Sequence, residues 1–495
     1  MTQAAETPPE RPTSLFRHPD FVRFWTAQTI SQFGSQVSQL AVPLVAIVFL
    51  GSSAFEVALL STMEFLPFVL FALPTGVWID RLRRRPVLIA ADAGRAALLA
   101  TIPAAYALGI LTIWQLYIVG FLVGVLTVFF DIAYQAYLPS LVDRDRILDG
   151  NAKLETTRSI AQTAGPAIAG WLIGVMTAPI AILANSVTFV ASGIALLLIR
   201  KPEPAPARST TAGGSDPADL ADPVGADGAV ALPPASASLR REVAAGVRYV
   251  AANPYLRAIA LSMAWANLFG QVVFSVFLLY AVRVLGLSAG VIGLVFGIGN
   301  VGLIVGAVTA SWFAARLGLG RAIVLSLAVA GPATLLIPLA PPGDPIPFLI
   351  AQGILFGWAV LVFNVNQVSF RQAITPEHLQ GRMNATMKFV ATVTIPAGSI
   401  LGGVLATAFG LREALLVGGI GSVFAFLPAL LSPVWRLRGI EDAAGLPGVH
   451  VPAAADRTRG EGGAVPEAVL GVLEPTFGGG EEAPGTWSQV GEDEG

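Results

Sequence analysis

Residues 76–85 read Gly-Val-Trp-Ile-Asp-Arg-Leu-Arg-Arg-Arg, and they end an apolar stretch, 55–79, that is long enough to cross a lipid bilayer as a helix. A second apolar stretch, 87–108, begins almost directly after them. Four arginines between two such stretches are typical of a short cytoplasmic loop, because basic residues are retained on the inner side of the membrane. The segment therefore predicts a pair of membrane-spanning helices.

The composition extends this interpretation to the whole chain. Of its 495 residues, 54% are apolar and only 13% are charged, whereas a soluble domain carries roughly 25% charged residues. The chain has no cysteine and only three histidines, far apart, which argues against disulfides, a metal site and cysteine or Ser-His catalysis. None of its three lysines precedes Ser or Thr, so a Walker-type phosphate loop is absent. We expect a membrane protein that is not an enzyme and that binds lipid, no cofactor and no nucleic acid.

Twelve apolar stretches approach the roughly 20 residues that a helix needs to span the hydrocarbon. Six precede Pro202–Ser238, a segment of Pro, Ala, Ser, Gly and Asp that is typical of a linker, and six follow it. The spans are 22–50, 55–79, 87–108, 113–137, 154–176, 180–199, 255–280, 290–314, 322–340, 346–370, 384–407 and 412–433. The predicted fold is an all-α integral membrane protein with twelve transmembrane helices in two pseudo-symmetric six-helix bundles.

The expected domains are an N-terminal cytoplasmic segment, two bundles, the linker between them and a tail: 1–21, 22–199, 200–254, 255–433 and 434–495. Residues 440–495 hold eleven acids against two arginines, a net charge of −9, so we expect a disordered, solvated tail. Arginines concentrate in the loops of one side, which predicts cytoplasmic termini in a multi-pass protein of the cell (inner) membrane. A ratio of 27 arginines to three lysines suggests a GC-rich bacterial genome. We expect a monomer.

Short sequence matches relate the two halves of the chain. Arg81-Leu82 recurs as Arg316-Leu317, and Pro166 recurs as Pro396, at offsets of 235 and 230 residues. Matches in the same order at nearly one offset indicate a duplicated six-helix unit. Such repeats commonly build transporters, with the substrate site between the repeats near the membrane midplane.

A glycine pattern in the eighth span invites two interpretations. Gly297–Gly302 matches the string of a dinucleotide-binding loop, but it lies inside an apolar helix with no preceding strand. Gly293 with Gly297, and Gly302 with Gly306, form two GxxxG pairs, which predict close packing against another helix. We favour the packing interpretation.

Residues 76–85 resemble the loop signature of the major facilitator superfamily, G-x-x-x-D-R-x-G-R-R, with Arg83 in place of the second Gly. The resemblance implies that Asp80 is a latch at the inner gate, accepting hydrogen bonds from the N-terminus of the eleventh spanning helix. A helix N-terminus carries about half a positive charge, so a carboxylate suits it. In the second half Ala315 stands at the equivalent position, so the latch is one-sided. The expected inner-gate residues are Gly76, Asp80, Arg81, Arg84, Arg85 and Arg95.

Gly165–Gly170, in the fifth span, resembles the G-P-x-x-G-G motif of drug–proton antiporters, with Ala169 in place of one Gly. Pro166 removes a backbone donor, and Gly165 and Gly170 allow close approach, so a kinked, tightly packed helix is expected with or without antiport. Phe16–Phe21 and Arg371–Pro376 narrow the resemblance to the third drug:proton antiporter family, which includes macrolide-efflux and enterobactin-exporter proteins. This resemblance implies export rather than import.

Charges inside the spans are costly and mark functional sites. Asp92 and Arg95 share one helical face, and Asp131 lies at a matching depth, so we expect one cytoplasmic charge network with the arginines of residues 81–85. Glu64 lies near the midplane with no basic residue at its depth. Burial there favours the protonated acid, as a proton carrier requires, but a permanently neutral acid bonded to a backbone carbonyl fits equally well. The proton-coupling candidates are Glu64, Asp131 and Asp92.

Polar residues at helical spacing predict the wall of a substrate cavity. The candidates lie on the first, seventh and tenth spans, which line the central cavity in the superfamily: Gln28, Gln32, Ser35, Gln39, Asn267, Gln271 and Asn366. Hydrogen bonding between helices without a ligand is an equal alternative.

These features together predict a secondary active transporter. We expect it to export a small amphipathic compound, drug-like, macrolide-like or siderophore-like, in exchange for protons by alternating access. An importer or uniporter of the same fold is an alternative, as is a non-transporting membrane sensor or scaffold whose partner binds the acidic tail. An intramembrane enzyme is disfavoured, because no nucleophile is paired with a base.

Overall fold

The computed structural model describes residues 15–143, 146–203, 238–439 and 442. Within these ranges the chain is helical and contains no strand. Twelve helical segments there are long and apolar enough to cross a membrane. The expected all-α transmembrane fold is therefore confirmed.

Each half of the chain supplies six of the twelve spans. The first half consists of α1 (Pro19–Leu44) with its π-helical continuation η2 (Val45–Phe49), α2 (Ala54–Arg81), α3 (Arg84–Ala107), α4 (Ile113–Leu141), α5 (Ile147–Met176) and α6 (Ala178–Leu197). The second half consists of α8 (Pro254–Arg283), α9 (Ala289–Gly299), α10 (Val301–Leu317), α11 (Leu319–Leu339), α12 (Ile346–Ile374), α13 (Glu377–Phe409), α14 (Leu411–Val423), η5 (Phe424–Phe426) and α15 (Leu427–Leu430). The eighth span combines α9 and α10, and the twelfth combines α14, η5 and α15.

Side-chain caps fix the beginnings of several spans. Before α2, the Ser53 hydroxyl accepts a hydrogen bond from the Glu56 N–H, and the Glu56 carboxylate accepts one from the Ser53 N–H at 2.7 Å. At α8, Asn253 Oδ1 accepts from the N–H groups of Tyr255 and Leu256. These side chains satisfy backbone donors that have no partner within the helix, and so they favour helix starts at these residues.

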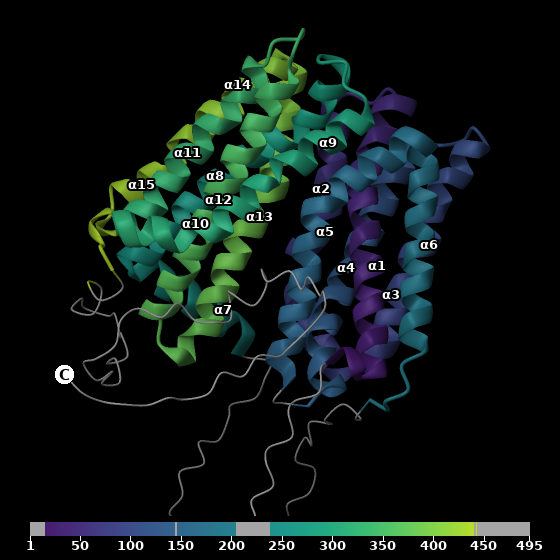
Figure 1. Cartoon of the computed structure of the whole chain (residues 1–495), viewed down its shortest axis with the longest axis horizontal. Coiled ribbons are helices and arrows are strands. Elements are labelled where there is room, and N and C mark those ends of the chain that lie inside the picture. Colours follow the sequence, from purple (N-terminus) through teal and green to yellow (C-terminus); the bar gives the residue numbers. More distant parts are fainter. Residues whose placement is uncertain (1–14, 144–145, 204–237, 440–441, 443–495) are drawn as a thin grey trace, which may run out of the picture. The chain divides into compact units, whose positions relative to one another are not determined.

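Helices of each half pack mainly against one another (Figure 1). In the first half α1 packs against α5 and α6, and α4 packs against α2 and α3. In the second half α8 packs against α13 and α14, and α11 packs against α12 and α14. Two seams join the halves: α5 packs against α9, and α2 packs against α13 and α8.

The spans have two ends, which lie on opposite sides of the expected membrane. The arginine-rich end is the one at which α2 ends and α3 begins, residues 81–85. The opposite end is the one at which η2 leads into α2, residues 50–53.

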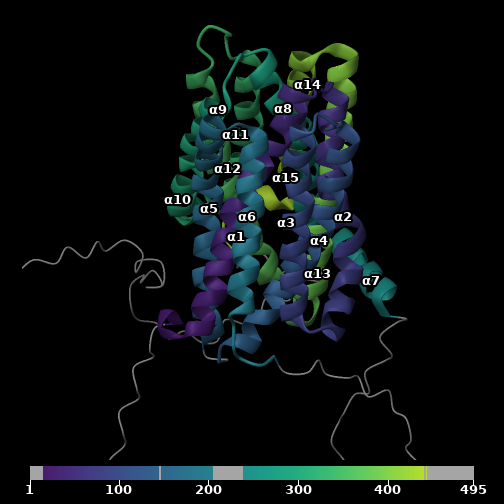
Figure 2. The same ribbon diagram turned by 90° about the vertical axis from the view of Figure 1, so that its right-hand side faces the viewer.

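The expected linker, 200–254, contains a further helix, α7 (Ser238–Ala252) (Figure 2). It packs against α13, where Gly246 faces the backbone of Arg382, and Val250 is buried. This helix was not predicted from the sequence, because it begins with charged residues and contains no apolar stretch long enough to span a membrane. Residues 204–237 of the linker lie outside the described ranges.

The tail boundary expected at residue 434 is wrong. The turn η6 (Pro433–Arg436) and the residues after it pack against the second half, with Val434 and Leu437 buried. The carbonyls of Leu437 and Arg438 accept hydrogen bonds from the N–H groups of Gly320 and Leu319, at 3.0 and 3.1 Å. These carbonyls cap α11, because the first N–H groups of a helix have no partner within it. Residues 443–495 lie outside the described ranges.

Candidate functional site: a cavity between the two halves

A cavity of about 1130 Å³ lies between the helices of the first half and α13. Ligand pockets typically enclose about 300–1,000 Å³, so a large organic molecule fits. The second half contributes Ala385, Lys388, Phe389 and Thr392 from α13. The first half contributes polar and charged residues together with aromatic ones: Gln28, Ser31, Gln32, Ser35, Arg95, Thr127, Asp131, Gln135, Asn151, Glu155, Arg158, Gln162, Phe68, Phe130 and Tyr134.

The cavity occupies the part of the helices nearer the arginine-rich end. Along α5 its lining residues follow helical spacing: Asn151, Glu155, Arg158 and Gln162. Along α4 the lining continues to Leu138, close to the end of that helix.

Close backbone packing seals the two halves toward the opposite end. A Cβ added to Gly170 of α5 would lie 2.6 Å from the Gly293 Cα of α9, and one added to Gly403 would lie 2.6 Å from the Ala58 Cβ of α2. The Arg283 guanidinium also donates a 2.7 Å hydrogen bond to the Ser52 carbonyl. The molecule is therefore closed between its halves at the opposite end, and the cavity lies on the arginine-rich side of this seal.

The structure brings only part of the expected polar wall to the cavity. Gln28, Gln32 and Ser35 line it. Gln39 and Asn267 do not, and Gln271 instead donates to the Ser399 hydroxyl at 3.0 Å. The buried Asn366 amide donates to the Val362 carbonyl at 2.8 Å. On the second half, Gln271 and Asn366 therefore form hydrogen bonds to protein groups of their own half, as in the alternative without a ligand.

Asp92 and Arg95 form an ion pair buried between α3 and α6, with an N–O distance of 2.5 Å. The Ser192 hydroxyl of α6 donates to the second carboxylate oxygen at 2.6 Å. The Arg95 guanidinium also lies over the rings of Phe130 and Phe189, 4.2 and 4.3 Å from their centres. Asp92 is fully buried and is not a cavity residue, so its interactions are those of a packing element.

Asp131, unlike Asp92, lies at the cavity wall and outside any ion pair of the described residues. It lines the cavity, and its carboxylate has no hydrogen bond or ion pair with any residue in the described parts of the chain. Arg95, Arg158 and Lys388 act on it electrostatically. Lys388 comes from α13 and also lines the cavity, so this carboxylate is influenced by a positive group of the other half.

Glu64 is not among the residues that line the cavity. Its Cγ packs against Gly120 of α4, where an added Cβ would approach it to 3.3 Å. No hydrogen bond or ion pair of its carboxylate occurs within the ranges that the structure describes.

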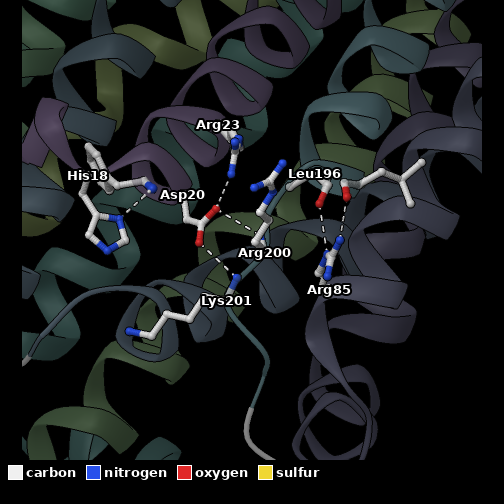
Figure 3. Close-up of polar contacts among 9 residues, drawn as sticks. His18, Asp20, Arg23, Arg85, Leu196, Arg200 and Lys201 are labelled. Carbon is white, nitrogen blue, oxygen red and sulfur yellow. Dashed lines mark hydrogen bonds and ion pairs between the residues drawn. The ribbon is translucent and has the colours of Figure 1, made fainter.

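Of the inner-gate arginines, Arg95 pairs with the buried Asp92, whereas the Arg85 side chain binds backbone carbonyls. Arg85 donates to the carbonyls of Leu196 and Leu197 at 3.0 and 2.7 Å (Figure 3). The N–H groups of Arg84 and Arg85, at the start of α3, donate to the Glu203 carboxylate. Arg95 acts electrostatically on both Asp92 and Asp131. No hydrogen bond or ion pair joins the arginines of residues 81–85 to these two acids in the described part of the chain, and the Arg85 guanidinium is instead bonded to the carbonyls at the end of α6.

A second carboxylate joins α1 to the same segment. Asp20 accepts hydrogen bonds from the N–H groups of Arg200 and Lys201, each at 3.0 Å, and pairs with Arg23 at 2.7 Å (Figure 3). The residues that follow α6 are thus held against α1 and α3. Gly76 lines the cavity, the Arg81 side chain is exposed, and the side chain of Asp80 lies outside the described part of the chain.

Sequence reasoning missed three charged residues of the cavity, Glu155, Arg158 and Lys388. Glu155 and Arg158 approach each other to 3.7 Å. A signal for Lys388 was present, since it is the one lysine inside a predicted span. Among the described residues, no group of three or more His, Asp or Glu could hold a metal ion.

Twelve helical spans with a cavity between the two halves are an arrangement common in membrane transporters. A model of the major facilitator superfamily matches residues 24–342 and 260–455. The chain belongs to this superfamily, and it is a transporter rather than an enzyme.

Curated relatives and solved structures agree with this family. Macrolide efflux protein A of Streptococcus pyogenes is 28% identical over 185 residues, 37% of this chain and 45% of that protein. Its Enterococcus faecalis counterpart is 30% identical over 146 residues, 29% of this chain and 45% of that protein. The matched region thus spans less than half the length of either relative. The crystal structure of a bacterial homologue of the iron transporter ferroportin, in an inward-facing state, shares the fold with a TM-score of 0.63 and 16% identity, covering 85% of this chain and 99% of that one.

Proposed function

We propose that the protein exports a small amphipathic compound in exchange for protons, by alternating access. The cavity carries this proposal, because it combines aromatic rings with amides and titratable groups on one side of a sealed interface. The rings of Phe68, Phe130 and Phe389 suit the apolar part of such a compound. Gln28 suits its polar part, since the side chain is only 6% exposed and its carbonyl oxygen has no hydrogen-bond partner. The macrolide efflux relatives support export.

The orientation of the protein follows from its charges. Arginines are retained on the cytoplasmic side, so the arginine-rich end faces the cytoplasm together with both termini. The state described is then inward-facing, in the cell membrane of a bacterium. The division into two bundles at residues 22–199 and 255–433, and a monomeric transporter, belong to the same proposal.

Asp131 is the primary site of proton coupling in this scheme. It is the acid of the three candidates that lines the cavity, where a substrate and a proton can influence each other directly. Glu64 does not line the cavity and is the second candidate. Asp92 is held by Arg95 and Ser192 and stabilises the first half.

Transport assays test the proposal directly. Cells that express the protein should accumulate less of some members of a chemically diverse compound panel than cells without it, and an uncoupler should abolish the difference. In everted vesicles, such a compound should partly collapse a preformed pH gradient. Accumulation above the control would indicate an importer instead. Absence of any flux across the panel, with normal membrane expression, would favour the sensor or scaffold.

A further inference from the structure

Asn300 divides the eighth spanning helix at the level where the seal between the halves meets the cavity. The helix runs as α9 to Gly299 and resumes as α10 at Val301. From the opposite end inward, Gly293 packs against Gly170 and Gly297 packs against Ala167, so Asn300 comes next in the same line. Its side chain reaches α5 at Gln162, the residue at which the cavity lining of α5 begins.

The contact that Asn300 makes is chemically specific. Its side-chain amide donates a 2.9 Å hydrogen bond to the Gln162 carbonyl and a 3.3 Å bond to the Thr163 carbonyl. In an α-helix the Gln162 carbonyl would accept from the N–H of residue 166. Residue 166 is proline, which has no N–H, so this carbonyl has no donor within its own helix. Asn300, from the other half, supplies the missing donor.

This arrangement is particular to Pro166. Eight other prolines lie inside helices of the described ranges: Pro43, Pro67, Pro74, Pro103, Pro139, Pro332, Pro338 and Pro396. The carbonyls four residues before them receive no side-chain hydrogen bond from other described residues. Pro396, the counterpart of Pro166 in the sequence repeat, lies four residues after Thr392, which lines the cavity.

We propose that Asn300 is a positioning residue of the transport cycle, which holds the opposite end closed by bonding to the carbonyl that Pro166 leaves free. The inference rests on the proposed alternating access. Opening of the seam between α5 and α9 would separate the pair and expose the Gln162 carbonyl to the cavity, where water can replace the amide. The bond therefore favours the closed seam without preventing it from opening, because water can hydrogen-bond to the Gln162 carbonyl once the amide has left.

Cysteine labelling without substrate measures the state of the seam, and the chain has no native cysteine. Ser52→Cys is a conservative reporter at the opposite end, where Ser52 is 3% exposed. Ala385→Cys reports the cavity, where Ala385 is exposed. Asn300→Leu should raise the labelling rate at the first reporter and lower it at the second, each roughly two- to tenfold, as expected for loss of one hydrogen bond. Asn300→Ala serves as a second variant if the larger side chain disturbs folding.

A double-mutant cycle distinguishes the proposed bond from general packing. Pro166→Ala restores an N–H that can bond to the Gln162 carbonyl, so adding Asn300→Leu to it should change labelling by less than about half of its effect in the wild-type background. In the control, Pro396→Ala, Asn300→Leu should keep its full effect. Equal effects in the two proline backgrounds, or no effect of either Asn300 variant on labelling, would overturn the proposal. Failure of export alone would not, because labelling is read without substrate or a proton gradient.

Discussion

Three acids of the first half illustrate how the environment of one residue decides its use. Asp92 is fully buried with two partners, Asp131 faces the cavity, and Glu64 packs against α4 without lining the cavity. A carboxylate committed to a buried ion pair is costly to neutralise, whereas one at a cavity wall can exchange a proton with water. Proton coupling therefore belongs to Asp131 in our scheme.

Neutral variants of these acids test the assignment. Asp131→Asn should lower the rate of uphill export driven by a pH gradient at least tenfold relative to wild type. Downhill substrate exchange should remain, because exchange needs no net proton movement. Glu64→Gln should retain most uphill export. Asp92→Asn should mainly destabilise the protein, by about 3–5 kcal/mol for breaking a buried pair, measured as a fall in Tm in detergent. If Glu64→Gln loses uphill export and Asp131→Asn does not, coupling lies at Glu64.

At the scale of elements, the α5–α9 seam depends on the absence of side chains. Gly170 and Gly293 bring two backbones so close that an added Cβ would meet main-chain atoms, which cannot rotate away. Small residues serve this purpose in membranes, because helices there associate mainly through van der Waals packing and hydrogen bonds. One turn farther toward the opposite end, Gly174 is looser, and an added Cβ would lie 3.9 Å from Gly290.

Two alanine variants of α5 compare these positions. Gly170→Ala should force the seam apart and shift the protein toward opening at the opposite end, with roughly tenfold faster labelling at Ser52→Cys, equivalent to about 1.4 kcal/mol. Gly174→Ala should label at the wild-type rate, because its Cβ makes an ordinary contact. Similar labelling of both variants would show that close packing at Gly170 does not hold the seam closed.

At the scale of the whole molecule, the segment after the last span belongs to the folded protein. The backbone of residues 437 and 438 caps α11, and Val434 and Leu437 are buried against the second half. The boundary between the transporter and its acidic tail therefore lies farther along the chain than composition indicated.

Two truncations test this boundary. Removal of residues 452–495 should leave Tm and transport unchanged, because every described contact is retained. Removal of everything after Leu431 should lower Tm clearly, since each buried donor left without a partner costs about 1–3 kcal/mol and two N–H groups at the start of α11 lose their acceptors. Equal Tm values for the two proteins would contradict the capping role, and lost transport in the shorter truncation alone would support the sensor or scaffold alternative.

The sequence by itself determined the membrane environment, the twelve spans and the side on which arginines gather. Hydropathy and span length are local properties, so each stretch can be recognised without knowing its neighbours. The resemblance carried by residues 76–85 and 165–170 also gave the family correctly. The same local criterion missed α7, whose stability comes from packing against α13 and not from its own composition.

Only the tertiary structure decided which polar groups meet. Gln28 and Gln271 both read as cavity residues by spacing, but one lines the cavity and the other bonds to Ser399. Lys388 and Asp131 line the same cavity from different halves, and Asn300 donates to the carbonyl that Pro166 leaves free. The physical reason is that a polar residue every third or fourth position defines a helical face without fixing what that face touches. The rotation of each helix and its neighbours, set by packing of the whole molecule, supplies the missing information.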